Sequence, residues 1–332
     1  MSGKRELVLK VLQGEATERV PVGFWYHFTQ ENEWLKGFGN QEIIQKNLQG
    51  HQKFLKDVEP DFIKLMSDGY FAYPHEQLQG LTSIKDLADL EPLGAEHPWI
   101  EEQLDLVRKI KASFTEDIFA FYNVFAPATY FKWLLVGVGQ GDKELTDLLE
   151  EDAEAVQKVL ATIAQDLASL SQRLIEEVGL DGIYLSVQTI QDERLTKELY
   201  QTFIAPSELA VLAAANQAQG LNILHICGYE GAKNNLSLFQ AYPAQVFNWA
   251  VGAEGVSLAQ GRKLFQGKTV LGGFANAKSG LLYGGSQTEV EQETRRLIAE
   301  AGQTGLILGA DCTLPSDIDP KRIDWVRQAA RI

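Results

Sequence analysis

The chain has 332 residues, of which 30 are Lys or Arg and 45 are Asp or Glu, so its formal net charge is −15. This acidic balance excludes proteins that bind nucleic acid or anionic membranes through a basic surface. Two cysteines exclude a disulfide scaffold and indicate a reducing compartment, while an apolar share of 45% is enough for a large core.

The N-terminal residues place Leu and Val at helical spacing between charges, which predicts a helix over residues 3–14 rather than a secretory signal. The longest apolar stretch, residues 118–139, carries Asn123, Pro127 and Lys132. These residues favour a buried strand followed by a buried helix over a membrane span. We therefore expect a soluble, cytoplasmic protein.

Eight short apolar runs alternate along the chain with longer amphipathic segments. The runs are rich in Val, Ile, Leu and Phe and nearly continuous, as expected for strands that are covered on both faces. They are Val20–Trp25, Phe62–Met66, Ile118–Phe125, Gly182–Val187, Leu221–Cys227, Gln245–Ala250, Thr269–Phe274 and Gly305–Gly309.

The segments between the runs are predicted to be helices, because their apolar residues recur every three or four positions. Residues 152–176 and 289–301 show this spacing most plainly, and Thr288 followed by Glu291 predicts a capping box at the start of the second segment. Thr196–Phe203 and Pro206–Ala218 are predicted to form a helix pair.

The alternation predicts a (β/α)8 TIM barrel, with a doubly wound open sheet as the alternative. An internal echo supports a repeated unit, since residues 175–185 and 298–308 both contain a helix end, a Gly and a strand opened by a second Gly. No linker interrupts the pattern, so we predict one domain over residues 1–332. Helical insertions are predicted within the two long connections, residues 69–116 and 126–181.

Catalytic residues of a TIM barrel lie at the carboxyl ends of its strands. The side chains that follow the predicted strands are therefore the candidate site residues. They are His27, Asp68, Asn123, Gln188, His225, Cys227, Trp249, Asn276, Asp311 and Cys312.

The most informative pattern is His225-Ile226-Cys227, because side chains two apart on a strand point to the same side. The only other cysteine, Cys312, follows the last predicted strand. Two thiolates and one imidazole form a catalytic type of zinc site with one open position. Such a site acidifies a bound thiol and leaves the thiolate nucleophilic, which favours thiol alkylation. The alternative is that both cysteines are small buried hydrophobic residues.

Asp68 is predicted to be catalytic, either as a general acid or as a fixed charge that stabilises a cation; its alternative role is in a turn or a helix cap. His27 and its neighbour Tyr26 are candidates for substrate contacts, although His27 also suits a hydrogen-bonded position in the wall. We predict further substrate contacts from three residues at the other strand ends: Gln188, Trp249 and Asn276.

Several segments resemble the uroporphyrinogen decarboxylase superfamily, and within it the zinc-dependent branch that includes the cobalamin:coenzyme M methyltransferases. The segments are RELVLKVLQGEATERVPVGFW, ELYQTFIAPSELAVL, LLYGGSQTEVEQETRRLIAEAG and GLILGADCTLPSDIDPKRIDWV, together with ILHICG and the late cysteine. The resemblance implies a (β/α)8 barrel with His225, Cys227 and Cys312 as zinc ligands. It also implies that a methyl group moves between a zinc-bound thiol and methylcobalamin supplied by a corrinoid protein.

Two other functions stay open. The decarboxylases of the superfamily need no metal and gather the carboxylates of uroporphyrinogen with arginines after the first strand, next to an Asp that Asp68 matches in position. Here that loop has the sequence YHFTQENEW and contains no Arg or Lys before Lys36, which disfavours a polycarboxylate substrate. A barrel that binds a tetrapyrrole or a corrinoid partner as a carrier or sensor is the third hypothesis. The oligomeric state stays open, with a homodimer as the candidate assembly.

Overall fold

The computed structural model describes residues 3–87, 90–229 and 231–331. In these residues, seven parallel strands form one curled sheet in chain order. The strands are β1 (Phe62–Leu65), β2 (Phe119–Phe125), β3 (Gly182–Val187), β4 (Ile223–Ile226), β5 (Val246–Trp249), β6 (Thr269–Phe274) and β7 (Leu306–Ala310). Seven of the eight predicted strands are thus confirmed.

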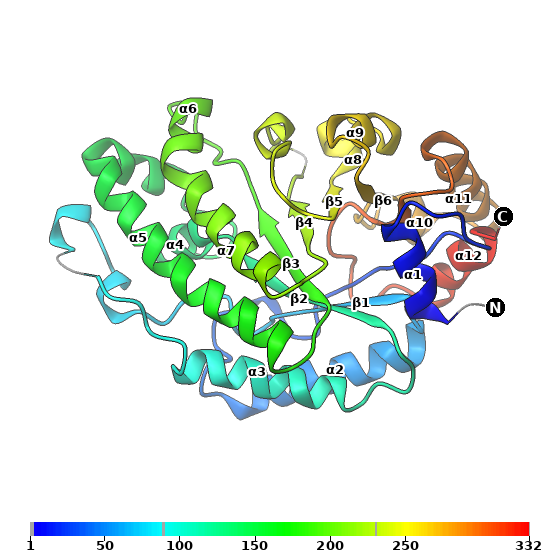
Figure 1. Ribbon diagram of the computed structural model, residues 1–332, viewed down its shortest axis with the longest axis horizontal. Helices are drawn as coiled ribbons and strands as arrows, with labels where there is room; N and C mark the ends of the chain where they lie inside the picture. The colour runs from blue at the N-terminus through cyan, green and yellow to red at the C-terminus, as the bar shows by residue number, and fades with distance from the viewer. Residues whose placement is uncertain (1–2, 88–89, 230, 332) are drawn as a thin grey trace.

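Helices surround the sheet (Figure 1). The α-helices are α1 (Lys4–Leu12), α2 (Gln41–Val58), α3 (Pro98–Lys111), α4 (Pro127–Leu135), α5 (Asp142–Glu176), α6 (Lys197–Leu199), α7 (Ala205–Gln217), α8 (Val251–Glu254), α9 (Leu258–Leu264), α10 (Leu281–Gly284), α11 (Gln287–Ala301) and α12 (Lys321–Ala329). Short 3-10 helices cover Glu31–Glu33, Glu76–Leu78, Ile84–Asp86 and Leu236–Phe239, and a π-helix, Tyr200–Ile204, joins α6 to α7.

The first predicted strand, Val20–Trp25, is not a regular strand in the described residues, so seven strands of the predicted eight-stranded barrel are shown. The segment makes isolated bridges instead, from Val22 to Leu308 and from Tyr26 to Leu314. The amide of Asp61 also donates to the carbonyl oxygen of Val22. The segment therefore touches both β7 and the entry to β1. It contains Pro21, which has no N–H to donate to a ladder.

The core has two parts because alternate strand residues face opposite sides of the sheet. One cluster fills the concave inside of the curled sheet; it contains Trp25, Phe62, Met66, Phe119, Phe121, Tyr184, Ile223, Val246, Leu271 and Ile307. A larger cluster lies between the sheet and the helices. Strand residues in register therefore share a face, and His225 of β4 lies opposite Ser186 of β3 and Asn248 of β5.

The helix predictions are confirmed in place and corrected at their ends. Helix α5 begins ten residues before the predicted start, and Asp152 interrupts it with extended backbone. The Asp152 side chain accepts a hydrogen bond from the amide of Ala155, as an N-cap residue does. The capping box of α11 is formed by Ser286 and Glu289, two residues before the predicted pair.

The long connections contain α3, α4 and α5, as predicted. The apolar stretch of residues 118–139 forms β2 and α4. No helix within the described residues combines the length and the apolar character that crossing a membrane requires.

Candidate metal centre

Three potential metal ligands converge at the carboxyl edge of the sheet. His225 lies near the end of β4, Cys227 follows that strand, and Cys312 follows β7. The Cys227 and Cys312 Sγ atoms are 3.9 Å apart, and Cys312 Sγ is 3.5 Å from His225 Nε2. Within the part of the chain that the structure describes, these are the residues whose ligand atoms could together hold an ion.

The spacing of the three atoms fits a zinc ion. A tetrahedral ion with Zn–S bonds of about 2.3 Å and a Zn–N bond of about 2.1 Å separates two sulfurs by about 3.8 Å, and a sulfur from a nitrogen by about 3.6 Å. The observed distances agree with both values. Three protein ligands leave one coordination position open, as in catalytic zinc sites.

Asn248 of β5 selects the nitrogen of His225 that can bind the ion. Its Nδ2 donates to the carbonyl oxygens of Leu271 (2.9 Å) and Ala310 (3.2 Å), so its Oδ1 must accept. This oxygen accepts from His225 Nδ1 and from the Tyr184 hydroxyl. The Nδ1 atom of His225 therefore carries the proton, and the lone pair of Nε2 faces the two sulfurs.

The hydrogen bond between the two thiols shifts their pKa values in opposite directions. The hydrogen bond that Cys227 donates lowers the pKa of Cys312 well below its usual range. The same hydrogen bond, together with burial, raises the pKa of Cys227 well above its usual range. An ion held by both sulfurs as thiolates would displace the thiol protons.

Packing behind the ligands fixes the loop after β4. The side chain of Asn234 donates to the carbonyl oxygen of Cys227 at 2.9 Å and to Glu254 Oε1 at 2.8 Å. A Cβ atom at Gly228 would lie 2.2 Å from that same Glu254 oxygen. A side chain at position 228 would therefore have to displace the Glu254 carboxylate from its hydrogen bond with Asn234.

The three ligands line a cavity of about 180 Å³. Aromatic rings form one wall of the cavity: His27, Trp34, Phe71, Phe125 and Trp133. The rings pack against one another, with centroids 4.6 Å apart for Phe125 and Trp133 and 4.1 Å apart for His27 and Trp34. The cavity can hold a small ligand next to the metal position and shield it from water.

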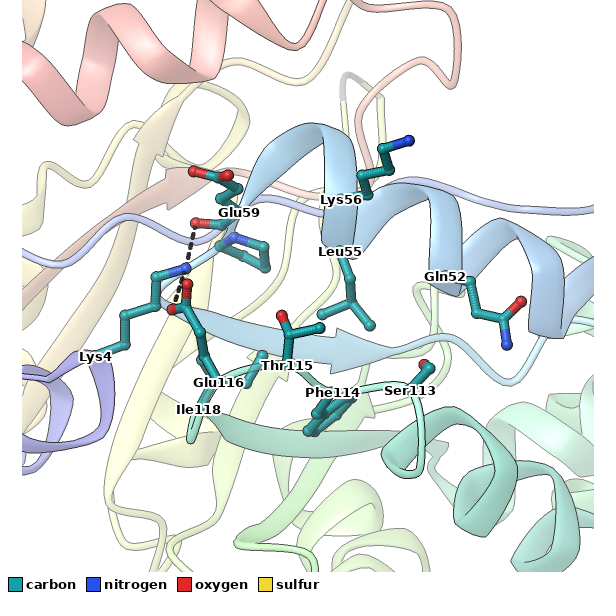
Figure 2. A pocket seen from close by; sticks show the side chains of 11 residues that line it. Lys4, Gln52, Leu55, Lys56, Glu59, Ser113, Phe114, Thr115, Glu116 and Ile118 are labelled. Carbon is teal, nitrogen blue, oxygen red and sulfur yellow. Dashed lines mark hydrogen bonds and ion pairs between the residues drawn. The ribbon is translucent and has the colours of Figure 1, made fainter.

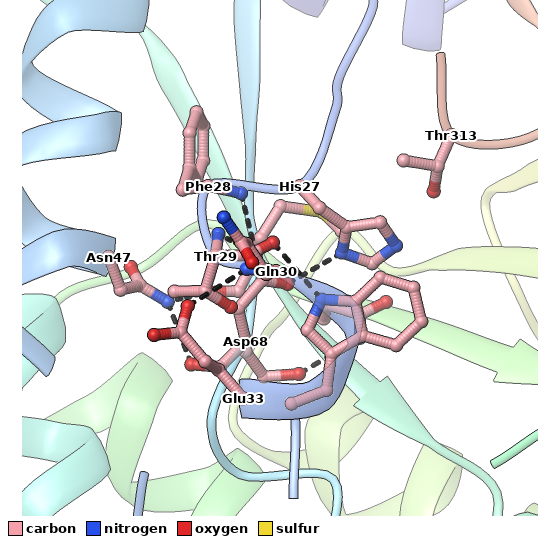
Figure 3. Close-up of polar contacts among 12 residues, drawn as sticks. His27, Phe28, Thr29, Gln30, Glu33, Asn47, Asp68 and Thr313 are labelled. Carbon is pink, nitrogen blue, oxygen red and sulfur yellow. Dashed lines mark hydrogen bonds and ion pairs between the residues drawn. The ribbon is translucent and has the colours of Figure 1, made fainter. Parts of the chain in front are cut away.

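Asp68 is not among the described residues that line the cavity; Figure 3 shows its polar contacts with the segment around His27. It is fully buried; its Oδ1 contacts His27 Nδ1 at 2.7 Å, and its Oδ2 accepts from the amides of Phe28 (2.6 Å) and Thr29 (3.3 Å). The Asn47 side chain of α2 donates to the backbone carbonyl oxygen of Asp68. Asp68 therefore orients His27, whose other nitrogen is turned away from the carboxylate.

The remaining predicted residues separate into two groups. Gln188 lines the cavity, and its Oε1 accepts from Lys132 Nζ at 3.0 Å. Tyr26 lies outside and packs against Phe54 of α2 at 5.1 Å between ring centroids. Asn276 is also outside, where its Nδ2 donates to the carbonyl oxygen of Thr313.

Trp249 lies on the opposite face of the sheet from the cavity. It is fully buried, packs against Phe265, and donates from its indole nitrogen to the carbonyl oxygen of Val256. Side chains alternate along a strand, so its neighbour Asn248 faces the inside instead. On β5 it is therefore Asn248, and not the predicted Trp249, that faces the inside of the sheet.

Sequence reasoning missed two residues of the site, Asn248 and Lys64. Each is a polar residue inside an apolar strand, and that interruption is the signal that could have revealed them. Alternation along β1 places Lys64 on the same face as Phe62 and Met66, which belong to the inner cluster. Lys64 lines the cavity.

A second hollow, of about 310 Å³, lies where the chain enters β1 and β2, at the opposite edge of the sheet (Figure 2). Lys4 Nζ crosses it to Glu116 (2.9 Å) and to the carbonyl oxygen of Glu59 (3.2 Å). None of the three potential metal ligands lines this hollow. The chemistry is therefore concentrated in the cavity at the carboxyl edge.

Comparisons with known proteins identify the family and the fold. Residues 74–332 match the family model described as uroporphyrinogen decarboxylase (URO-D). A methyltransferase from Methanosarcina mazei has a similar fold, with a TM-score of 0.70 and 12% identity over 99% of this chain and 98% of that chain. A B12-independent methionine synthase from Shewanella sp. W3-18-1 also has a similar fold, with a TM-score of 0.54 and 12% identity over 94% and 97% of the two chains. No curated protein matches the chain.

Proposed function

The chain belongs to the uroporphyrinogen decarboxylase family, and from this premise we propose that it is a zinc-dependent methyltransferase, which moves a methyl group between a corrinoid protein and a thiol held at the metal. The observation that carries the proposal is the convergence of His225 Nε2 and the Sγ atoms of Cys227 and Cys312 at one cavity. The solved methyltransferase of similar fold supports the same reaction class.

When bound, zinc would hold the thiol as a nucleophilic thiolate. In the transfer, the sulfur loses its proton and gains the methyl group, and the corrinoid cobalt loses that group. The proposal assigns proton acceptance to His27, which lines the cavity and whose Nδ1 contacts Asp68. We therefore assign Asp68 the role of positioning His27. The proposal assigns contact with the thiol substrate to Gln188, which lines the cavity.

Exposed apolar side chains near the cavity support the proposal that a protein partner docks there. Val136 and Tyr229 keep 46% and 52% of their surface exposed. Val136 lies two residues before Val138, which lines the cavity, and Tyr229 lies two residues after Cys227. Exposed apolar side chains next to a mouth suit docking of a second protein. A corrinoid protein could bring its methyl group to the cavity from this side.

The test combines metal content with methyl transfer. The native protein should contain about one zinc ion per chain after purification without added metal. It should form a methyl thioether from methylcobalamin and a small thiol, as measured by mass spectrometry. Cys312→Ala should lose the zinc and the activity together. A metal-free native protein whose two thiols both react with DTNB would contradict the proposal.

Decarboxylation of uroporphyrinogen is the second candidate, favoured by the description of the matching family model. The described lining of the cavity includes one basic side chain besides His27 and His225, that of Lys64, and no arginine. This lining is poorly suited to a substrate with many carboxylates. Release of coproporphyrinogen at high enzyme concentration, unaffected by Cys312→Ala, would support this candidate instead.

A further inference from the structure

Lys64 is a buried cation without a polar partner. It lies within β1 and faces the inside of the sheet, and only 4% of its surface is exposed to solvent. Its Nζ lies 4.1 Å from the ring centroid of Tyr184 and 5.0 Å from that of Trp25. Among the residues that the structure describes, no acceptor forms a hydrogen bond or an ion pair with it. Burial of an uncompensated charge costs several kcal/mol, so this position requires a physical explanation.

The ammonium lies close to the metal ligands. Lys64 lines the same cavity as His225, Cys227 and Cys312. The two rings that contact its Nζ are also neighbours of His225, with ring centroids 5.7 Å from it for Tyr184 and 6.5 Å for Trp25. Burial lowers the pKa of Lys64 to about 8, and the charges of the two cysteines oppose this shift.

The other buried lysine near the site shows what a compensated cation looks like. Lys132 retains 1% of its side-chain surface, but its Nζ contacts both carboxylate oxygens of Asp142, at 3.0 and 3.2 Å, and Gln188 at 3.0 Å. A carboxylate therefore contacts Lys132 directly, whereas Lys64 forms no hydrogen bond or ion pair with any described residue and has the charges of Cys312, Cys227 and Asp68 only at longer range.

A charge count shows what is missing. Two thiolates balance a divalent ion, and the neutral imidazole of His225 adds no charge. With a neutral molecule in the open position, the positive charge of Lys64 remains unbalanced. With an anion in that position, the metal centre and Lys64 together are neutral.

We propose that Lys64 makes the open position of the metal centre selective for an anionic ligand, a thiolate rather than a neutral molecule, by supplying the balancing positive charge. This inference rests on the metal centre of the proposed function. Lys64 acts through the electrostatic field and makes no bond to the ion. Removing its charge should therefore weaken the binding of anions and leave the binding of neutral ligands unaffected.

The test uses the protein loaded with Co²⁺, whose visible absorption reports on ligands in the open position. Azide serves as the anionic probe, pyridine as the neutral probe and mercaptoethanol as the thiol. In Lys64→Met, the dissociation constants of azide and mercaptoethanol should rise about tenfold or more, equivalent to about 1.4 kcal/mol. The constant for pyridine should change less than about twofold, and Lys64→Arg should keep the affinities of the native protein.

Equal effects on azide and pyridine, or no effect on either, would overturn the role of Lys64 while the metal centre stands. A native protein that binds neither Zn²⁺ nor Co²⁺ stoichiometrically would overturn the proposed function itself, and this inference with it. If Lys64→Met does not fold, Lys64→Gln permits the same comparison, because it removes the charge and keeps a polar side chain. A merely structural role would not separate the anionic probe from the neutral one.

Discussion

At the scale of single residues, hydrogen bonds from the strands decide the chemistry of the site. The amide of Asn248 uses its two donors on carbonyl oxygens of β6 and β7, which leaves its oxygen for His225 Nδ1. This contact fixes both the tautomer and the plane of the imidazole. Groups that orient metal-bound histidines in this way contribute strongly to metal affinity.

Asn248→Ala should therefore weaken zinc binding by about 10- to 100-fold, as measured by competition with a chromophoric chelator. Asn123→Ala is the matched control, because Asn123 is also a buried asparagine lining the cavity but bonds to Ser67 and Ser186 rather than to a ligand. Native zinc affinity in Asn248→Ala would show that His225 is oriented by packing alone.

Glu208 of α7 is a buried carboxyl group away from the metal centre. Burial raises its pKa to about 7, although the hydroxyls of Tyr242 and Tyr200 donate to it and oppose the shift. The folded state therefore keeps the proton over a pH range in which the unfolded chain has already lost it. The contribution of Glu208 to stability is therefore greatest below about pH 4.5 and is lost as the pH rises through about 7.

The expected loss from this group is about 3 kcal/mol, at about 1.4 kcal/mol per pKa unit. Glu208→Gln cannot ionise, so its free energy of unfolding should decrease less between about pH 5 and about pH 8 than that of the native protein. Urea denaturation at both pH values measures the difference. Glu198→Gln changes an exposed carboxylate on α6 and is the control. An unchanged pH dependence in Glu208→Gln would contradict the assignment.

At the scale of elements, the segment Val20–Trp25 bonds to β7 and to the entry of β1, as a strand would, but makes only isolated bridges. The fully buried Asp61 holds the start of this segment. It accepts a hydrogen bond from the amide of Val22 at 2.8 Å and forms a bidentate ion pair with Arg19. Gly23 donates to the carbonyl oxygen of Leu308 and passes directly over Phe62. Close approach of the backbone to this ring requires glycine.

Gly23→Ala should destabilise the fold by about 1–3 kcal/mol, because its Cβ would lie 1.9 Å from a ring carbon of Phe62, which is buried in the inner cluster. Guanidinium denaturation provides the measurement. Gly284→Ala is the control, since the nearest atom to its Cβ would be 3.7 Å away. Equal stabilities of the two variants would show that Phe62 can move aside.

At the scale of the whole molecule, the metal position joins distant parts of the chain. Cys227 and Cys312 are 85 residues apart, and β5 and β6 lie between their strands. The two ends of the chain also meet, since the amide of Val20 donates to the carbonyl oxygen of Ala330. An ion at the centre would therefore connect β4 with the segment that leads from β7 to the C-terminal helix.

Removal of zinc should lower the melting temperature, because an ion that binds only the folded state stabilises it. At a free metal concentration 100 times the dissociation constant, the contribution is about 2.7 kcal/mol, or about 4 °C for a chain of 332 residues. Calorimetry with and without EDTA measures the change, and Cys312→Ala should melt at the same temperature in both conditions. An equal EDTA effect in that variant would assign the effect to another site.

The sequence by itself determined the seven parallel strands and the principal helices, because apolar periodicity and turn residues are local signals. It also predicted His225, Cys227 and Cys312 as ligands, and the spacing of the first two on one strand predicted their common side. Only the tertiary structure decided that Cys312 reaches His225, that Asp68 lies behind His27, and that Asn248 rather than Trp249 faces the inside. These facts depend on how separate strands align, and a shift of one residue reverses the face of a side chain.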